Sequence, residues 1–162
     1  MSKLSLAFLL AITVTGCATH PSAAPSPTTR QETNLAVARK LYADFMKGDI
    51  DSVLGAMSDD VVWEIAGPAN VPYAGVRHGK KEWMAYLAGL GAVELLAFEP
   101  TEFLADKDKV VVIGSERLKV KSNGRVIDEQ FAQVITFAGG KVVHFRSYDD
   151  SAASAAAFKA VP

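Results

Sequence analysis

The chain has 162 residues, 49% of them hydrophobic, and a formal net charge of −1 at pH 7. The length fits a single domain with a sizeable core, and the near-neutral charge argues against nucleic acid as a partner. The single cysteine excludes an internal disulfide framework.

Residues 1–16 have the pattern of a secretory leader. Lys3 supplies a positive charge, and the apolar run from Leu4 to Val14 makes about 17 Å of helix, too short to cross a bilayer. Val14-Thr15-Gly16-Cys17 then resembles the lipobox of bacterial lipoproteins, in which the cysteine is lipidated and becomes the mature N-terminus. An ordinary secretory signal with an incidental cysteine is the alternative interpretation.

Residues 17–33 are predicted to be a flexible tether, because three prolines, small residues and little apolar bulk are typical of a linker. We therefore expect a lipid-anchored protein of the cell envelope. Its domain would span residues 34–151, followed by an Ala-rich tail over residues 152–162. Ala18, not Asp, follows Cys17, which in lipoproteins of Gram-negative bacteria favours the periplasmic side of the outer membrane.

Three helices and a strand are expected in the first half of the domain. A helical face of apolar residues begins near Asn34 and ends before Gly48, which suits a left-handed C-cap. Asp49 caps a second, shorter helix. A strand follows at Val61–Ile65, then a loop, then a third helix over Gly79–Leu90.

The second half is predicted to be a β meander with strands over residues 93–104, 110–121, 125–137 and 141–148. Asn123-Gly124 predicts a type I′ hairpin turn, because both residues tolerate positive φ. Gly139-Gly140 marks another turn. Residues 151–162 are either a short helix or without regular structure.

This order of elements predicts an α+β domain in which a curved antiparallel sheet wraps around three helices. Several segments carry a family resemblance: Leu41-Tyr42-Ala43-Asp44-Phe45, Gly48-Asp49, Asp59 to Glu64, Gly67-Pro68, Pro72 to Gly75, His78-Gly79-Lys80 and Gly140 to Asp149. They are similar to the SnoaL-like branch of the nuclear transport factor 2-like (cystatin-like) superfamily, which includes ketosteroid isomerase and polyketide cyclases. The resemblance implies a cone-shaped α+β barrel around a pocket, although a shared fold is no evidence of shared chemistry.

In catalytic relatives, the resemblance implies, a carboxylate inside the cone is the general base, and Tyr, Asp or Arg groups stabilise an oxyanion. The candidates for the base are Asp149, Glu64, Glu129, Glu116 and His78. His78 directly precedes a helix, so a capping or surface role is at least as good an interpretation. On the paired strands, Glu129 and an arginine of the neighbouring strand are expected to form an ion pair on the outer surface.

Alternation along the last strand leaves two arrangements open. If Phe145 faces the core, Asp149 is the carboxylate of the cone and Arg146 lies on the outer or dimer face. If Arg146 and Tyr148 face inward, they form an oxyanion-stabilising pair and Asp149 lies at the rim. We favour the second arrangement, because a fully exposed Val-His-Arg-Tyr face would be unusual and the family pattern points the same way.

Ligand-binding candidates come from several elements. Trp63 is in phase with its apolar neighbours and should face inward, as a core residue or as a pocket wall. Tyr73 is a second candidate for the wall, and Gln133 shares a face with Glu129, Phe131 and Ile135 of its strand. Tyr42 and Phe45 complete the set, although core packing is the commoner role for residues of this kind.

Two functional hypotheses follow. The first is a cofactor-independent isomerase, cyclase or hydrolase with a small apolar substrate, in which Asp149 or His78 is the base and Arg146 and Tyr148 orient an oxygen. The second is a non-catalytic ligand-binding module that forms a homodimer through its sheet face. A purely structural lipoprotein is a third, weaker hypothesis. No phosphate-binding glycine loop or His-x-x-x-His motif is present, so we expect neither a cofactor nor a metal.

Overall fold

Residues 26–159 are described by the computed structural model, so the predicted leader, Cys17 and the first part of the tether lie outside the described residues. Within residues 26–159 no helix is both long and apolar enough to cross a membrane. The elements in chain order are α1 (Pro27–Lys47), α2 (Ile50–Ala56), β1 (Met57–Ile65), β2 (Gly75–His78), α3 (Gly79–Leu90), β3 (Val93–Asp106), β4 (Lys109–Val120), β5 (Val126–Ala138), β6 (Lys141–Tyr148) and α4 (Ser151–Ala157).

The strands form one sheet in the order β2-β1-β6-β5-β4-β3. Strands β3 to β6 are the predicted antiparallel meander, and the predicted α+β class is confirmed. The sheet, predicted as antiparallel, is mixed, because one pair differs: β1 pairs with β6 in parallel, with Trp63 opposite Phe145. These two strands are far apart in the sequence, so no hairpin fixes their relative direction. The sheet is also open, with β2 and β3 at its edges, and does not close into a barrel.

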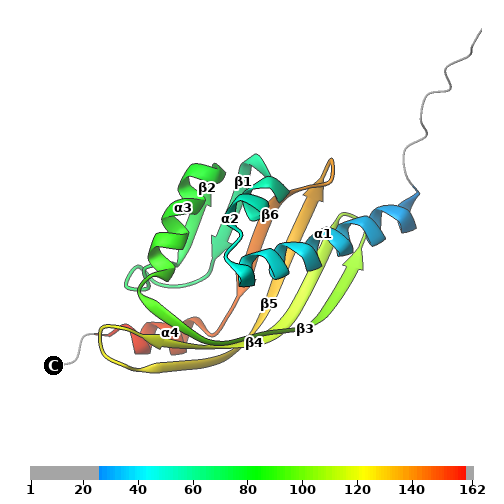
Figure 1. Ribbon diagram of the computed structural model, residues 1–162. Coiled ribbons are helices and arrows are strands. Elements are labelled where there is room, and N and C mark those ends of the chain that lie inside the picture. The colour runs from blue at the N-terminus through cyan, green and yellow to red at the C-terminus, as the bar shows by residue number, and fades with distance from the viewer. Residues whose placement is uncertain (1–25, 160–162) are drawn as a thin grey trace, which may run out of the picture.

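The sheet bends where the antiparallel pairing of β3 with β4 is irregular. The register between these strands shifts on both sides of Pro100, which pairs with Gly114. A Cβ on Gly114 would lie 2.4 Å from the carbonyl oxygen of Glu99, so only glycine allows this close approach. Such irregularities increase local twist and curvature. Figure 1 shows the long strands β3 to β5 curving beneath the helices, which leaves a concave face.

Helices α1, α2 and α3 lie over this concave face, and α4 lies at the end of the molecule remote from the start of α1 (Figure 1). Their apolar faces supply the core, as the helical periodicity predicts. Trp83 of α3 is fully buried and meets Trp63 of β1 edge-on, with ring centroids 5.7 Å apart. Ala38 and Leu41 of α1 are buried in the same cluster.

The domain begins with more helix than predicted, and its Ala-rich tail takes the helical one of the two predicted forms. Helix α1 begins at Pro27 and not near Asn34, so residues 27–33 of the expected tether are helical. Ser26 caps this helix through Oγ, which accepts the N–H of Thr29 at 3.2 Å. A proline at the first helical position costs no hydrogen bond, so Pro27 starts the helix where the sequence suggested a linker. The Ala-rich tail starts with α4, capped by Asp150, which makes a fourth helix among the described residues.

The two expected hairpin turns differ in type. Gly139 and Gly140 both have positive φ, as a type I′ turn requires. At Asn123-Gly124 only Gly124 does, so the prediction of a type I′ turn there was wrong. The Asn123 side chain accepts the N–H of Arg125 at 3.0 Å and donates to the carbonyl oxygen of Ala157 at 2.9 Å. These bonds hold a longer turn and tie it to the end of α4.

Candidate functional site

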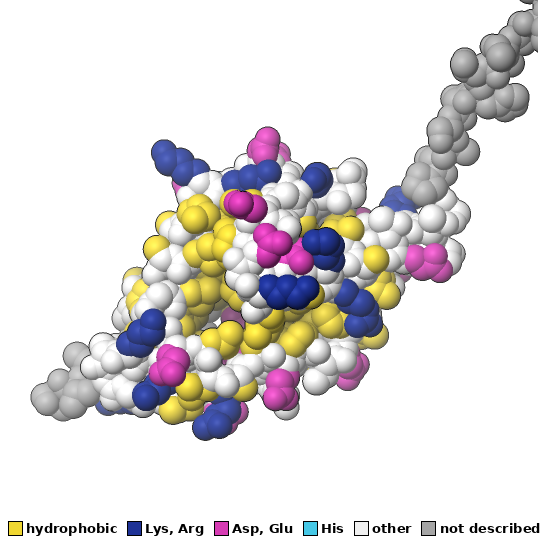
Figure 2. Space-filling view, viewed as in Figure 1, with side chains coloured by type: hydrophobic (Ala, Val, Ile, Leu, Met, Phe, Trp, Pro, Cys, Tyr) yellow, Lys and Arg dark blue, Asp and Glu magenta, His cyan; other side chains and the backbone are white. Residues whose placement is uncertain are grey.

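A cavity of about 200 Å³ lies between the concave face of the sheet and the helices. Figure 2 shows it as a hollow rimmed by hydrophobic side chains, with acidic side-chain atoms visible inside. Most of its wall is apolar or aromatic. The apolar and aromatic lining residues are Leu41, Tyr42, Phe45, Val53, Trp63, Ile65, Tyr73, Trp83, Tyr86, Leu90, Val93, Leu95, Phe98, Leu118 and Phe145.

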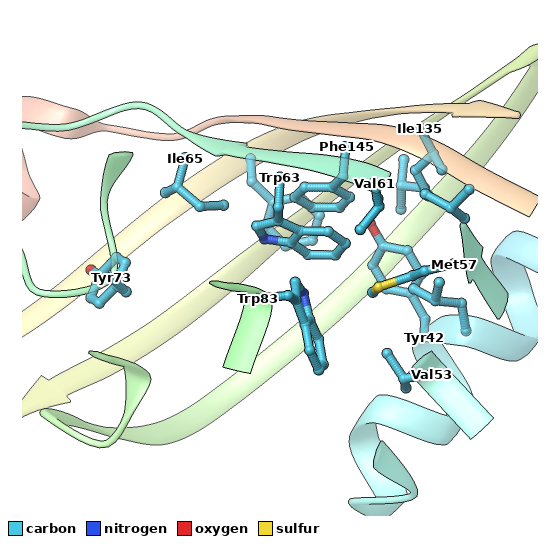
Figure 3. Packing of buried hydrophobic residues seen from close by; sticks show 14 of the residues in the cluster. Tyr42, Val53, Met57, Val61, Trp63, Ile65, Tyr73, Trp83, Ile135 and Phe145 are labelled. Carbon is cyan, nitrogen blue, oxygen red and sulfur yellow. The ribbon is translucent and has the colours of Figure 1, made fainter. Parts of the chain in front are cut away.

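Aromatic rings from different elements form one side of the cavity. Trp63 stacks on Phe145 with centroids 3.7 Å apart and planes 4° apart, and Trp83 of α3 packs edge-on against Trp63 (Figure 3). Tyr86 of α3 also packs against Trp63, with ring centroids 5.6 Å apart. The indole N–H of Trp63 is buried and has no hydrogen-bond acceptor in good geometry among residues 26–159. A buried donor of this kind is costly unless a partner is supplied. The Tyr86 hydroxyl beside it is the polar neighbour of this indole within the wall.

Tyrosine hydroxyls in the wall are held neutral. Tyr42 donates a hydrogen bond to Oε1 of Gln133, and the Tyr73 hydroxyl lies 3.5 Å from Oγ of Ser154. Burial raises the pKa of Tyr42 well above its usual value and that of Tyr73 to about 12. Burial raises the pKa of Tyr86 as well. These phenols can donate protons in hydrogen bonds but are not ionised near neutral pH.

Three carboxyl groups meet at one end of the cavity. Glu116 on β4 lies directly opposite Glu129 on β5, and Asp149 follows the end of β6. Glu116 and Asp149 line the cavity, whereas Glu129 is not part of its wall and is only 6% exposed. Oγ of Ser147 donates a 2.5 Å hydrogen bond to Oδ1 of Asp149 and holds that carboxyl in place.

The environment of these acids favours their protonated forms. Burial raises the pKa of Glu116 to about 8, with further contributions from Asp149 and Glu129. Burial and the charge of Asp149 raise the pKa of Glu129 to about 7. Burial also raises the pKa of Asp149, against the opposing effect of the bond from Ser147. The cluster therefore shares protons near neutral pH, which suits it to acid–base chemistry.

No positive side chain balances this cluster from within the cavity. Among the described residues that line it, none is lysine, arginine or histidine. Within residues 26–159 there is also no group of three His, Cys, Asp or Glu side chains placed to hold a metal ion.

The last strand has the orientation that we did not favour. Phe145 and Ser147 face the cavity together with Asp149, whereas Arg146 and Tyr148 face outward. Nη1 of Arg146 lies 3.6 Å from Oε1 of Glu64 on the outer face of the sheet, and Tyr148 is 49% exposed. The stack of Phe145 on Trp63 fixes this choice, because it buries apolar rings that the other orientation would expose.

His78 lies outside the cavity, on the surface. It is exposed, and its backbone N–H donates to Oε2 of Glu82 at 2.7 Å, while its side chain makes no capping bond. The catalytic role considered for His78 therefore has no support in its position. Glu64 lies on the outer face, where its Oε2 is 3.3 Å from Nε2 of His144.

The expected ion pair of Glu129 on the outer surface was wrong. Arg117 instead pairs with Asp128, with Nε and Oδ2 3.2 Å apart, and Glu129 faces inward. The sequence contained a signal for this orientation. Glu129 is in phase with Ile127 and Phe131, both of which are buried, so alternation places it on the inner face.

All five ligand-binding candidates line the cavity: Tyr42, Phe45, Trp63, Tyr73 and Gln133. Trp83, Tyr86 and Phe98 also line the cavity, although they were not among the predicted wall residues. Their helical or strand periodicity predicts burial, but periodicity does not distinguish a packed core from a hollow one.

The comparisons with known proteins agree with this architecture. The family model of the SnoaL-like domain matches residues 38–145. An NTF2-like protein of Burkholderia xenovorans is 30% identical with a TM-score of 0.73, and the match covers 80% of this chain and 98% of that one.

Two further solved structures are similar. An NTF2-like protein of unknown function from Burkholderia pseudomallei is 27% identical, with a TM-score of 0.70, covering 79% of this chain and 98% of that one. TerC, co-crystallized with polyporic acid, is 25% identical with a TM-score of 0.64, and the match covers 75% of this chain and 94% of that one. No match was found among curated proteins. The matched segment contains the helices and most of the strands that build the cavity, and the chain belongs to the SnoaL-like domain family.

Proposed function

We propose that the cavity binds a small, mostly apolar molecule and that Asp149 exchanges a proton with it, as in a cofactor-independent isomerase, cyclase or hydrolase. The position of Asp149 carries this proposal: its carboxyl faces an aromatic enclosure and is oriented by Ser147. Burial raises its pKa toward the range in which a carboxylate is an effective base.

The size of the cavity limits the ligand. A cavity of about 150 Å³ lined by apolar side chains accepts benzene in another protein. The cavity of about 200 Å³ found here therefore suits a molecule of one or two rings. TerC, a relative with the same fold, was co-crystallized with polyporic acid, which supports a small molecule as the class of ligand.

The surrounding groups suggest how the chemistry would be divided. Asp149, as carboxylate, would accept a proton from a C–H group next to a carbonyl or from a water molecule. Glu116 would hold a proton nearby, because its raised pKa favours the neutral form. The hydroxyl of Tyr86, which lines the cavity and stays neutral because burial raises its pKa, would donate to the oxygen on which negative charge develops.

Proton exchange at the α-carbon of small cyclic ketones in D₂O tests this proposal, with NMR as the readout. Asp149→Asn is expected to reduce the exchange rate by about 10²–10⁴-fold, the usual contribution of a general base. Arg146→Ala is the matched control, because this residue is on the same strand end but faces away from the cavity. An unchanged rate in Asp149→Asn would remove Asp149 from the mechanism.

A non-catalytic ligand-binding and dimerisation module is the second candidate. Apolar side chains form a row across the outer face of the sheet, where Leu104 pairs with Val111 and Val111 with Val134. Leu104 is 54% exposed in the single chain, so a second copy could cover it. This candidate predicts a homodimer that Val134→Lys dissociates in sedimentation experiments. It also predicts ligand-dependent thermal stabilisation without turnover.

We also propose, from the N-terminal sequence alone, that Cys17 carries a lipid that anchors the protein in the cell envelope. Mass spectrometry of the mature N-terminus tests this directly. An acylated Cys17 would support the anchor, and Cys17→Ser should release the protein from the membrane fraction. A mature N-terminus at another residue would refute it.

A further inference from the structure

The acidic end of the cavity carries charge that no positive side chain of its described wall balances. Glu116, Glu129 and Asp149 come from adjacent strands and meet without a basic residue in the described wall of the cavity. Glu129, only 6% exposed, lies behind the wall, where its carboxyl hydrogen-bonds with that of Glu116 when the pair shares a proton. Burying acids in this way is costly unless protons or a bound cation compensate their charge.

Other titratable groups near the cluster do not supply that compensation. Tyr42, Tyr73 and Tyr86 approach from α1, the loop before β2 and α3. Burial, and after it the charge of the acids, raises the pKa of each phenol. Asp150, the next residue after Asp149, adds another negative charge near Glu129. Every ionisable group that faces the cluster is thus an acid or a neutral phenol.

Next to this acidic end the wall is aromatic. The faces of Trp, Tyr and Phe rings attract cations, and an ammonium group carries three hydrogen-bond donors. Trp63, Tyr86 and Phe98 line the same cavity as Glu116 and Asp149. Aromatic walls that end in carboxylates are complementary to an organic ammonium ion.

Building on the proposed ligand pocket, we propose that its ligand is an amine: a molecule of one or two rings whose protonated amino group enters the acidic end. The ammonium group donates to Glu116 and Asp149, the two acids that line the cavity, and the charge of Glu129 behind them attracts it further. The rings of the ligand pack against Trp63 and Phe98. The alternative is that the acids keep their protons and accept only a neutral ligand.

Matched pairs of amines and alcohols distinguish these two cases. We would titrate the purified protein at pH 7 with benzylamine, 2-phenylethylamine and tryptamine, and with the alcohol of the same carbon skeleton in each pair. Isothermal titration calorimetry in phosphate and in MOPS buffer reports both affinity and the number of protons released. At least one amine should bind tenfold or more tightly than its alcohol, with release of protons, because the ammonium group replaces protons shared by the acids.

Variants locate the effect. Glu116→Gln and Glu129→Gln keep the size of each side chain and remove its charge, and each should reduce the preference for the amine at least fivefold. Asp128→Asn is the control, since this neighbour of Glu129 faces outward and pairs with Arg117. The Asp128→Asn variant should prefer the amine over its alcohol by the same factor as the unmodified protein. Unfolding temperatures of all variants verify that each one is folded.

The possible failures have different meanings. If an alcohol binds as tightly as its amine, or if the preference persists in the Glu116→Gln/Glu129→Gln double variant, the inference is overturned and the pocket stands. If none of the six compounds binds at millimolar concentration, the inference and the proposed ligand pocket both fall.

Discussion

Glu116→Gln is expected to change how the stability of the protein depends on pH. Burial, and then the charges of Asp149 and Glu129, raise the pKa of Glu116 from 4.5 to about 8 in the folded state. The folded protein therefore keeps a proton that the unfolded chain has already released between these two values. The stabilisation that this bound proton provides is present at low pH and is lost as the pH rises through this window.

The size of the effect follows from this difference in bound protons. One extra proton in the folded state lowers the free energy of unfolding by about 1.4 kcal/mol for each pH unit. Between pH 5 and pH 8, about three units of this window, the upper limit is about 4 kcal/mol. Because the three acids share their protons, we expect about half of this limit, about 2 kcal/mol, from Glu116 alone.

Urea denaturation at pH 5, 6, 7 and 8 measures this contribution. Glu116→Gln should match the unmodified protein at pH 5, where Glu116 is neutral, and should be more stable by about 2 kcal/mol at pH 8. Asp128→Asn, an exposed control on the neighbouring strand, should keep the pH dependence of the unmodified protein. Parallel stability profiles for Glu116→Gln and the unmodified protein would show that Glu116 does not retain a proton on folding.

Three further tests, each with a matched second variant, probe the structure around the cavity by urea or thermal unfolding. Trp63→Ala should cost about 3–5 kcal/mol, because it removes a stacked ring from the core, and Trp63→Phe should cost less than half as much. Tyr42→Phe leaves Gln133 without its donor and should cost about 1–3 kcal/mol. Adding Gln133→Leu should recover part of that loss in a double-mutant cycle. Gly114→Ala places a Cβ 2.4 Å from a carbonyl oxygen and should cost about 1–3 kcal/mol. Gly55→Ala, which meets open space in α2, should stabilise by up to about 1 kcal/mol. Equal unfolding temperatures for the two glycine variants would contradict the account of the bend in the sheet.

Much of the fold could be predicted because local periodicity is strong in this chain. Alternation defined β4, β5 and β6, and the spacing of apolar residues defined α1 and α3. Errors occurred where local chemistry fits two structures. Pro27 is compatible with a linker and with a helix start, and Asn123-Gly124 is compatible with more than one turn.

In the candidate site, too, local periodicity predicted some features and could not predict others. Alternation grouped Phe145 with Ser147 and Asp149, but it could not tell which side of β6 faces the helices, and the orientation that we favoured was wrong. The sequence around Glu129 does indicate that this side chain faces inward, because Ile127 and Phe131, two residues away on either side, are apolar and share its face. Nothing in the local sequence showed that Glu116 lies opposite Glu129, because that register depends on the turn between their strands.

The sequence by itself determined the order of the elements and which residues share a face, because helical and strand periodicities are properties of neighbouring residues. Only the tertiary structure decided that β1 lies parallel to β6, that Trp63 stacks on Phe145, and that three acids converge on one cavity. Those outcomes depend on how a bent, open sheet packs against its helices, and packing between distant segments sets the pKa values and the free space on which function depends.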